Sequence, residues 1–310
     1  MIVLRSLDNL GEIKNSVVTI GTYDGIHLGH QQIFSEVIDR AKKRNAKSVF
    51  VTFEPHPKEV VKKTQVHLLT TLNERIEQFR NWLPDIVFIV NFTYEFSRLS
   101  PKEFYQQFVV NKFHASEIVE GSDHMFGRDR EAGIRELITM GKEFHFEVLV
   151  VPKVSVDGEE VSSSKIRTEI QDGNIEKAKS FLGRNYSLTG EVIRGDGRGK
   201  QLGFPTANIK PLSSNKLIPA LGVYVVNVSV GGKTYNGMLN IGTRPTFYEN
   251  GECSIEVNLF DVEKDFYGQE MTVHFLKRIR NDEKFSSVED LVSQIHSDKR
   301  QSLQYLQTIN

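Results

Sequence analysis

The sequence predicts an α/β domain followed by a small antiparallel β-barrel with a C-terminal helix. Its length of 310 residues exceeds one typical domain. Residues 1–185 alternate short apolar runs with longer amphipathic segments, the pattern of a parallel sheet covered by helices. From Tyr186 onward, short alternating strands and glycine turns replace that pattern. We therefore expect two domains, 1–185 and 186–310.

The first domain contains apolar runs that lack polar alternation, as strands buried on both faces of a sheet require. The clearest helix between them begins at Pro101, where Ser100 and Glu103 can form a capping box. Another amphipathic helix is expected over residues 28–42. The expected strands are Val17–Ile20, Ser48–Phe53, Ile86–Val90, Ala115–Val119 and Glu147–Val151.

The second domain is expected to consist of hairpins. The pair Gly231-Gly232 separates two apolar runs and suits a tight hairpin turn. Residues 254–261 and 270–279 alternate apolar and polar side chains, as half-buried strands do. A final helix is expected to open at a capping box formed by Ser286 and Glu289.

Composition excludes several classes of protein. Hydrophobic residues make up 39% and charged residues 25%, and the formal net charge of −1 gives no basic field for a nucleic acid. Cys253 is the only cysteine, which excludes an internal disulfide and a cysteine-based zinc site. No run approaches the roughly 18 apolar residues of a membrane span, and the N-terminal run is too short for a signal peptide. We expect a cytoplasmic protein without a membrane or nucleic-acid partner.

Residues 18–31, VTIGTYDGIHLGHQ, form the predicted turn from the first strand into the first helix. Ligands of open α/β sheets bind at this carboxyl edge, and amides at a helix N-terminus favour phosphate. His27 and His30 share one face, so both can donate to one anion and stabilise developing charge. Gly21 and Gly29 let the backbone turn and a ligand approach. The bare motif also suits two surface histidines; zinc would lack a third ligand.

The full turn, GTYDGIHLGH, resembles the G-x-F-D-G-x-H-x-G-H signature of the bacterial bifunctional riboflavin kinase/FAD synthetase family. Later stretches resemble the family's next motifs in the same order: TFEPHP at 52–57, GSDHMFGRDREAG at 121–133 and SSSKIR at 162–167. The resemblance implies a Rossmann-like nucleotidyltransferase domain that transfers AMP from ATP to FMN and releases pyrophosphate. Tyr23 replaces the usual Phe, Ser164 the usual Thr, and His124 an aromatic Phe.

The resemblance implies that His27, His30 and Arg167 are catalytic in adenylyl transfer. Arg167 can clamp β- and γ-phosphates, and the serines beside it can open a helix as an anion nest, although an ordinary capped helix remains the alternative. The implied nucleotide or phosphate contacts are Gly21, Thr22, Tyr23, Asp24, Gly29, Asp123, Ser162 and Ser164. Asp123 could equally well only cap its loop. The implied flavin contacts are Phe53, Pro55, His56 and Pro57, with a rigid proline-rich loop as the alternative.

A second motif occurs in RGDGRGKQLGFPTANI, residues 194–209. A dinucleotide-binding loop is excluded by its misplaced third glycine, and a Walker A loop at 231–234 is excluded because Asn227 occupies the required glycine position. GFPTAN resembles the riboflavin-kinase motif of the same family. Thr206 and Asn208 alternate onto one face and could hold Mg²⁺ that already carries ATP phosphates. The implied phosphate-binding flap consists of Gly195, Gly197 and Gly199, with Thr206 beside it; a glycine-rich barrel loop is the alternative.

Glu256 lies on the polar face of its predicted strand, at the position where the family has its catalytic base. The ribityl hydroxyl of riboflavin must lose a proton as it accepts phosphate, and a carboxylate can take it. A solvated strand glutamate is the alternative. Residues 240–247 resemble a flavin-site loop, which gives Asn240 and Arg244 as flavin contacts.

Together these motifs imply an enzyme that makes FMN and then FAD, with ATP, riboflavin and FMN as partners and Mg²⁺ as cofactor. Two alternatives remain open. An H-x-G-H adenylyltransferase for another phosphate ester would leave GFPTAN unexplained. A flavin-binding regulator without catalysis is opposed by the intact His27, His30, Thr206, Asn208 and Glu256.

Overall fold

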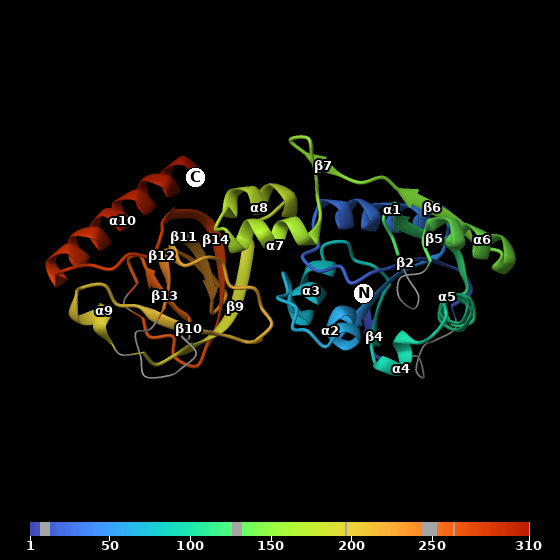
Figure 1. The fold of residues 1–310 in the computed structure, drawn as a ribbon, viewed down its shortest axis with the longest axis horizontal. Coiled ribbons are helices and arrows are strands. Elements are labelled where there is room, and N and C mark those ends of the chain that lie inside the picture. The colour runs from blue at the N-terminus through green and yellow to red at the C-terminus, as the bar shows by residue number, and fades with distance from the viewer. Residues whose placement is uncertain (7–12, 126–131, 196, 244–252, 263, 310) are drawn as a thin grey trace. The chain divides into compact units, whose positions relative to one another are not determined.

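The computed structural model describes residues 1–6, 13–125, 132–195, 197–243, 253–262 and 264–309 (Figure 1). The chain forms two compact units, Met1–Ser163 and Ser164–Asn310. This division falls at the start of helix α7 (Ser163–Gln171), whereas the sequence suggested residue 185. Each unit is described by itself.

The first unit contains a six-stranded sheet in the order β1-β4-β3-β2-β5-β6, with every neighbouring pair parallel. The five expected strands are confirmed. The edge strand β1 was not expected, because its three residues are too short to show a pattern. The strands are β1 (Ile2–Leu4), β2 (Ser16–Ile20), β3 (Lys47–Glu54), β4 (Ile86–Asn91), β5 (Ala115–Gly121) and β6 (Glu147–Val151).

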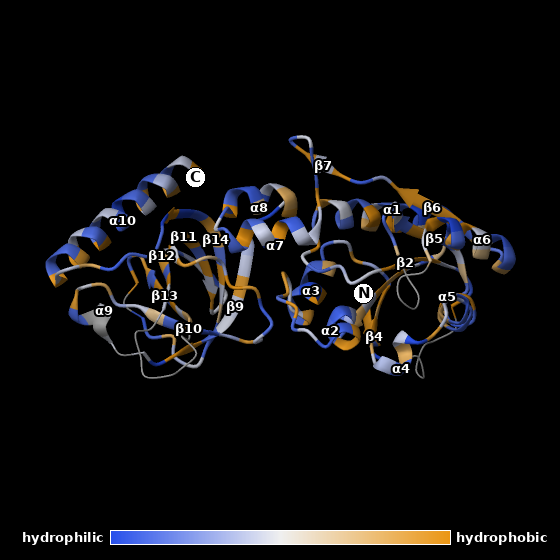
Figure 2. Ribbon diagram, in the orientation of Figure 1, coloured by the Kyte–Doolittle hydropathy of each residue, from blue (hydrophilic) through white to orange (hydrophobic). Residues whose placement is uncertain are grey.

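Both faces of this sheet are buried. Along β3, Phe50 belongs to one hydrophobic cluster while Val49 and Val51 belong to another, because successive strand side chains point to opposite faces. Figure 2 shows hydrophobic residues concentrated on the strands β4 and β6. The surrounding helices are α1 (Leu28–Arg44), α2 (Pro57–Lys62), α3 (Leu72–Phe79), α4 (Tyr94–Ser97), α5 (Pro101–Phe104) and α6 (Ile134–Phe144).

The helix expected after Ser100 begins as predicted. Ser100 accepts a hydrogen bond from the amide of Glu103, whose carboxylate accepts one from the amide of Ser100. The segment then continues as a π-helix, η1 (Tyr105–Val110), rather than as the expected α-helix.

The strand order reverses between β2 and β5. From β2 the chain proceeds to β3 and β4 on one side, and afterwards to β5 and β6 on the other. Backbone pairing between β2 and β5 ends at Val18 and Ile118, so the strands separate before the turn that follows Ile20. Such a switch point is where open α/β sheets bind ligands.

The second unit is a closed antiparallel barrel in the order β10-β13-β12-β11-β14-β9, as predicted. The hairpin between β11 and β12 turns at Gly231 and Gly232, whose φ angles of 57° and 74° suit a two-residue turn. The strands are β9 (Tyr186–Ile193), β10 (Ala207–Pro211), β11 (Gly222–Val230), β12 (Lys233–Thr243), β13 (Cys253–Leu259) and β14 (Glu270–Arg280).

The C-terminal helix α10 (Val288–Ile309) covers the barrel through Leu306, which belongs to a cluster with Val225 and Leu276. Most of its residues are hydrophilic (Figure 2), and its exposed hydrophobic residues include Val288, Leu303 and Ile309. The cap is Ser287, whose hydroxyl accepts a hydrogen bond from the amide of Asp290, one residue after the predicted Ser286.

Across the described part of the chain, no helix has the length and apolar character needed to cross a bilayer. A short hairpin, β7 (Ser155–Val156) and β8 (Glu159–Glu160), precedes α7.

Helices α7 and α8 (Ile175–Leu182) pack with the barrel. The carbonyl of Ile170 accepts a hydrogen bond from the amide of Ala220, 3.2 Å away. Arg278 of β14 donates to the carbonyl of Asp172, also at 3.2 Å. The barrel unit therefore includes these helices.

A fragment of residues 164–310 should be more stable than one of residues 186–310. Removing both helices would expose the barrel surface against which α8 packs, and each buried apolar side chain lost weakens folding by about 1.5–3 kcal/mol. We expect the melting temperature of the shorter fragment, measured by circular dichroism, to be lower by about 5 °C or more. Equal melting temperatures would show that the helices do not contribute to the stability of the barrel.

Candidate functional sites

Two histidine rings stack at the N-terminus of α1. His27 is the residue that precedes the helix and His30 lies in its first turn. Their ring centroids are 3.6 Å apart and their planes differ by 20°. A Cβ atom on Gly29 would lie 3.2 Å from Cε1 of His27, so a larger residue there would displace this ring. The sequence predicted that the two rings share a face, and the structure brings them together at the switch point of the sheet.

Tyr23 supports this pair from the protein interior. Its side chain is buried, and the edge of its ring packs against His30 with centroids 5.2 Å apart. Its hydroxyl lies 2.6 Å from Oγ1 of Thr19. Burial, and then the nearby Glu120 carboxyl, raises the pKa of the Tyr23 hydroxyl, which stays neutral. Gly21 is required here, because a Cβ atom would lie 2.7 Å from the Tyr23 ring.

Asp24 fastens the turn to the loop before α3. Its buried carboxylate accepts hydrogen bonds from the amides of Leu69 and Thr70 at 3.1 and 2.9 Å, and from the Thr70 hydroxyl at 3.2 Å. The amide of Gly25 donates back to that hydroxyl at 2.9 Å. The described contacts of the Asp24 carboxylate are thus with protein groups that hold the turn.

Arg75 of α3 is a positioning residue that the sequence did not indicate. Its side chain is only 2% exposed. One guanidinium nitrogen donates to the carbonyl of Thr22 at 2.5 Å and to the hydroxyl of Thr52 at 3.0 Å. The other donates to Glu54 at 3.0 Å. Burial lowers the pKa of Arg75, and the Asp24 and Glu54 carboxylates oppose this effect. Arg75 therefore ties the turn after β2 to the end of β3.

Some residues of the second motif, 52–57, are buried in the protein, and others lie at its surface. His56 is buried, and its Nδ1 atom accepts from the amide of Lys58, which caps α2. Pro57 is the first residue of that helix. Phe53 is partly buried and packs edge-on against Phe92, whereas Pro55 is exposed. His56 is one of the expected flavin contacts, and its Nδ1 atom is already engaged in capping α2.

In the third and fourth motifs, the residue that contacts the turn carrying Asp24 is not one of those expected. Asp123 is exposed after β5, and residues 126–131 of that motif lie outside the described residues. Ser163 donates through its hydroxyl to the carbonyl of Asp24, at 2.9 Å. The sequence had singled out the neighbouring Ser162, which is partly buried, and Ser164. Ser164 and the partly buried Arg167 belong to α7 in the second unit.

In the barrel, the expected kinase residues come together on neighbouring strands. β13 lies between β10 and β12, and Glu256 stands in register with Asn208 on one side and Asn240 on the other. Register partners point to the same face, so the three side chains form one polar row. The hydroxyl of Thr206 donates to Oε2 of Glu256 at 3.2 Å. Arg244 lies outside the described residues.

The glycines of the expected flap are required by close approach. A Cβ atom on Gly195 would overlap the side-chain amide of Asn208, and one on Gly199 would overlap the carbonyl of Phe204. Gly197 has a φ angle of 70°, which favours glycine. The loop includes the short helix α9 (Arg198–Gln201).

Asn258 is a further barrel residue that sequence patterning did not assign. It is buried, and its side-chain amide donates to the carbonyl of Pro205 at 2.7 Å. This contact attaches the GFPTAN segment to β13. A cavity of about 520 Å³ borders the same segment and is also lined by Asp261 and by Lys299 of α10.

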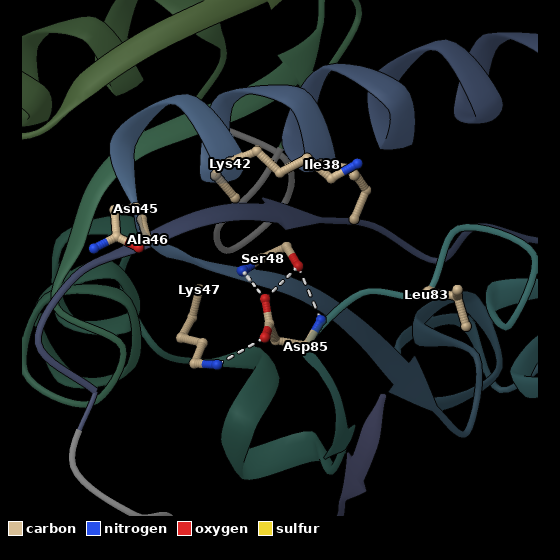
Figure 3. A pocket seen from close by; sticks show the side chains of 9 residues that line it. Ile38, Lys42, Asn45, Ala46, Lys47, Ser48, Leu83 and Asp85 are labelled. Carbon is tan, nitrogen blue, oxygen red and sulfur yellow. Dashed lines mark hydrogen bonds and ion pairs between the residues drawn. The ribbon is translucent and has the colours of Figure 1, made fainter.

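Another cavity, of about 420 Å³, lies at the opposite edge of the parallel sheet from the histidines (Figure 3). It is bordered by the end of α1 and by the starts of β3 and β4. Asp85 accepts hydrogen bonds there from Lys47 at 2.8 Å and from the Ser48 amide and hydroxyl at 3.0 and 2.9 Å. Burial alone would raise the pKa of Asp85, but these hydrogen bonds lower it overall. Because these residues lie at the edge where β3 and β4 begin, this cavity is separate from the histidine site.

Replacing Arg75 by Met should strongly destabilise the first unit. The substitution removes the donor to Glu54 and to the carbonyl of Thr22, and leaving a buried acceptor unsatisfied typically costs about 1–3 kcal/mol. Trp82, the only tryptophan of the chain, packs against Phe34 and reports unfolding of this unit by fluorescence. Urea unfolding should show the loss.

The matched control is Arg80→Met, which removes an exposed arginine paired with Glu77. We expect it to change the free energy of unfolding by less than about 0.5 kcal/mol. Similar effects of the two substitutions would contradict the positioning role of Arg75.

Comparisons with known proteins match a family model to each of the two parts of the chain. The FAD synthetase family matches residues 11–165, and the riboflavin kinase family matches residues 182–306. The bifunctional riboflavin kinase/FMN adenylyltransferase of Bacillus subtilis is 36% identical over 304 residues, covering 96% of this chain and 95% of that protein. The protein of the same name from Listeria monocytogenes is 36% identical and covers 92% and 91%.

A solved structure from Streptococcus pneumoniae, described as a macrolide-efflux protein, superposes with a TM-score of 0.86 at 33% identity. It covers 96% of this chain and 97% of its own. The predicted family is confirmed: the chain belongs to the bifunctional riboflavin kinase/FMN adenylyltransferase family.

Proposed function

We propose that this chain phosphorylates riboflavin to FMN in its barrel unit and adenylylates FMN to FAD in its α/β unit. The observation that carries the proposal is that each unit has its own polar cluster suited to one step. His27 and His30 stack at the switch point of the sheet, and Glu256 stands between Asn208 and Asn240 in the barrel. We place both reactions in the cytoplasm, where ATP and riboflavin meet.

In adenylyl transfer, a phosphate oxygen of FMN attacks the α-phosphorus of ATP, and the bond from that phosphorus to the pyrophosphate oxygen breaks. The FMN phosphate is already ionised at neutral pH, so the step needs no strong base. His27 and His30 would donate hydrogen bonds to the charge that develops on the α-phosphoryl group and pyrophosphate. Amides at the start of α1 favour the same charge. Arg167, with Ser162 and Ser164, would hold the outgoing phosphates.

The side chains behind the histidines have supporting roles in this proposal. Tyr23 packs on His30, and Asp24 holds the turn through Thr70. Gly21, Thr22 and Gly29 would contact the nucleotide through the backbone. Asp123, which is exposed at the same edge, would orient the ribose. Phe53, Pro55 and Pro57 would form the surface for the flavin ring, with His56 fixing the loop.

In phosphorylation, the ribityl hydroxyl of riboflavin attacks the γ-phosphorus of ATP, ADP leaves, and the hydroxyl proton passes to Glu256. Thr206 donates to one oxygen of Glu256 and so orients the carboxylate. General-base assistance of this kind typically accelerates a reaction by about 10²–10⁴-fold. Asn240, on the neighbouring strand, would contact the flavin, and Arg244 is a further predicted contact.

The residues present fit a magnesium ion. Thr206 and Asn208 offer two neutral oxygens, a set that suits Mg²⁺ when phosphates and water supply its remaining ligands. Gly195 lets the side chain of Asn208 lie against the backbone of the flap, where a Cβ atom would overlap its amide. When bound, the ion would neutralise charge on the ATP phosphates. Gly197 and Gly199 allow the flap to approach those phosphates.

His30→Ala should abolish FAD formation and leave FMN formation unchanged. Loss of one hydrogen-bond donor to a developing charge typically lowers the rate by about 10²–10³-fold. The measurement is the rate of FAD production from FMN and ATP, with riboflavin phosphorylation by the same preparation as the folding control. FAD synthesis within a few-fold of wild type would remove His30 from the mechanism.

Glu256→Gln should have the opposite effect. Glutamine keeps the size and hydrogen-bonding reach of the side chain but cannot accept the proton. Riboflavin phosphorylation should fall by about 10²–10⁴-fold. The loss should appear in kcat rather than in KM, because the interaction acts mainly in the transition state.

Glu191→Gln on β9 is the matched control for Glu256→Gln, since Glu191 is an exposed strand glutamate of the same barrel. It should leave phosphorylation unchanged, and both variants should convert FMN to FAD at the wild-type rate. Near-normal FMN production by Glu256→Gln would show that Glu256 is a solvated strand residue and not the base. Equal loss of both activities would instead mean that the substitution disrupts the fold or that the sites are coupled.

A further inference from the structure

A buried carboxyl group spans the gap where β2 and β5 separate. Backbone pairing between these strands ends at Val18 and Ile118. Two residues later, the amide of Ile20 donates to Oε1 of Glu120, at 2.7 Å, instead of to a strand carbonyl. Glu120 is only 2% exposed. Its side chain thus takes the place of the missing strand partner at the last residue before the GTYDGIHLGH turn.

The second oxygen of Glu120 contacts the loop that follows β5. Nδ1 of His124 lies 3.1 Å from Oε2, and its Nε2 atom lies 3.5 Å from the hydroxyl of Tyr105 on η1. His124 is the residue that departs from the aromatic side chain usual in the family. Glu120 and His124 therefore connect the end of β2 to the third motif of the site.

We propose that Glu120 and His124 are positioning residues for adenylyl transfer, whose contact fixes the end of β2 and the turn that carries His27 and His30. The inference rests on the proposed function of this unit. The connection passes through Ile20 to Gly21 and Tyr23, and the Tyr23 ring packs on His30.

The charges around the pair explain why a histidine accompanies this glutamate. Burial raises the pKa of Glu120 well above its usual range, and the hydrogen bond from Ile20 opposes that effect. Among the described residues, the other titratable groups coupled to Glu120 are Tyr23 and Tyr105, whose pKa values burial and Glu120 both raise. Burial makes Glu120 costly to ionise without a partner, and Nδ1 of His124 lies 3.1 Å from the oxygen that Ile20 does not contact.

His124→Phe tests the proposal by installing the family's usual aromatic ring. Glu120 then loses its partner and its link to the third motif. We expect kcat for FAD formation to fall by about tenfold or more, as misplacement of catalytic groups does. KM for ATP should change less, and riboflavin phosphorylation by the same chain should stay at the wild-type rate. His124→Asn, whose side-chain amide can replace Nδ1–H as donor, should retain most of the activity.

Thermal unfolding followed by Trp82 fluorescence separates this role from simple packing. Wild type is measured over the same window, about pH 5 to 6.5, as the reference. In His124→Phe, the folded chain holds a proton on Glu120 that the unfolded chain has released above about pH 4.3. Stability must then fall as pH rises through that window. Glu120→Gln/His124→Phe should remove the slope.

The proposal is overturned if His124→Phe keeps FAD formation within twofold of wild type. It is also overturned if the single and double variants melt in parallel across the pH window, because the loss would then come from shape alone. A wild-type protein that makes no FAD would refute the proposed function instead, and the melting curves would still decide whether the pair holds the turn.

Discussion

The divergence of β2 from β5 beyond Val18 and Ile118 is the constraint on which the site of the α/β unit depends. A parallel sheet that reverses its order must open at this point, and opening leaves amides without strand partners. Glu120 satisfies one of these amides, and the turn that starts there leads into the histidine pair. The separation that we propose as the nucleotide site therefore requires buried polar groups to hold its edges.

Two further contacts hold this opened edge. Asp24 fastens the turn to Thr70, and Arg75 joins it to the end of β3. In the barrel unit, the register of neighbouring strands positions the site residues instead. Because β13 lies between β10 and β12, backbone pairing in the closed barrel aligns Glu256 with Asn208 and Asn240. One unit thus depends on side-chain links across a gap, and the other depends on a continuous strand ladder.

The sequence predicted those parts of the molecule that depend on residues close together along the chain. Apolar runs and glycine turns predicted five of the six sheet strands and the hairpin at Gly231-Gly232, and ordered motifs predicted the family. Contacts made over long sequence distances were not predictable: Arg75 looks like any helix arginine, and Ser163 looks no different from its serine neighbours. Which unit contains α7 and α8 likewise depends on long-range packing, such as the hydrogen bond from Ala220 to Ile170. How Glu120 and His124 pair depends on where two strands separate, which periodicity does not encode.

We propose that one chain carries two separate sites that act in sequence on the same flavin. The most direct test is a time course of the full-length protein with riboflavin, ATP and Mg²⁺, resolved chromatographically into riboflavin, FMN and FAD. Two separate sites predict that free FMN accumulates first and that FAD follows after a lag, with the lag removed when FMN is supplied. Unconsumed riboflavin, or FAD formed without a lag and without free FMN, would contradict the account.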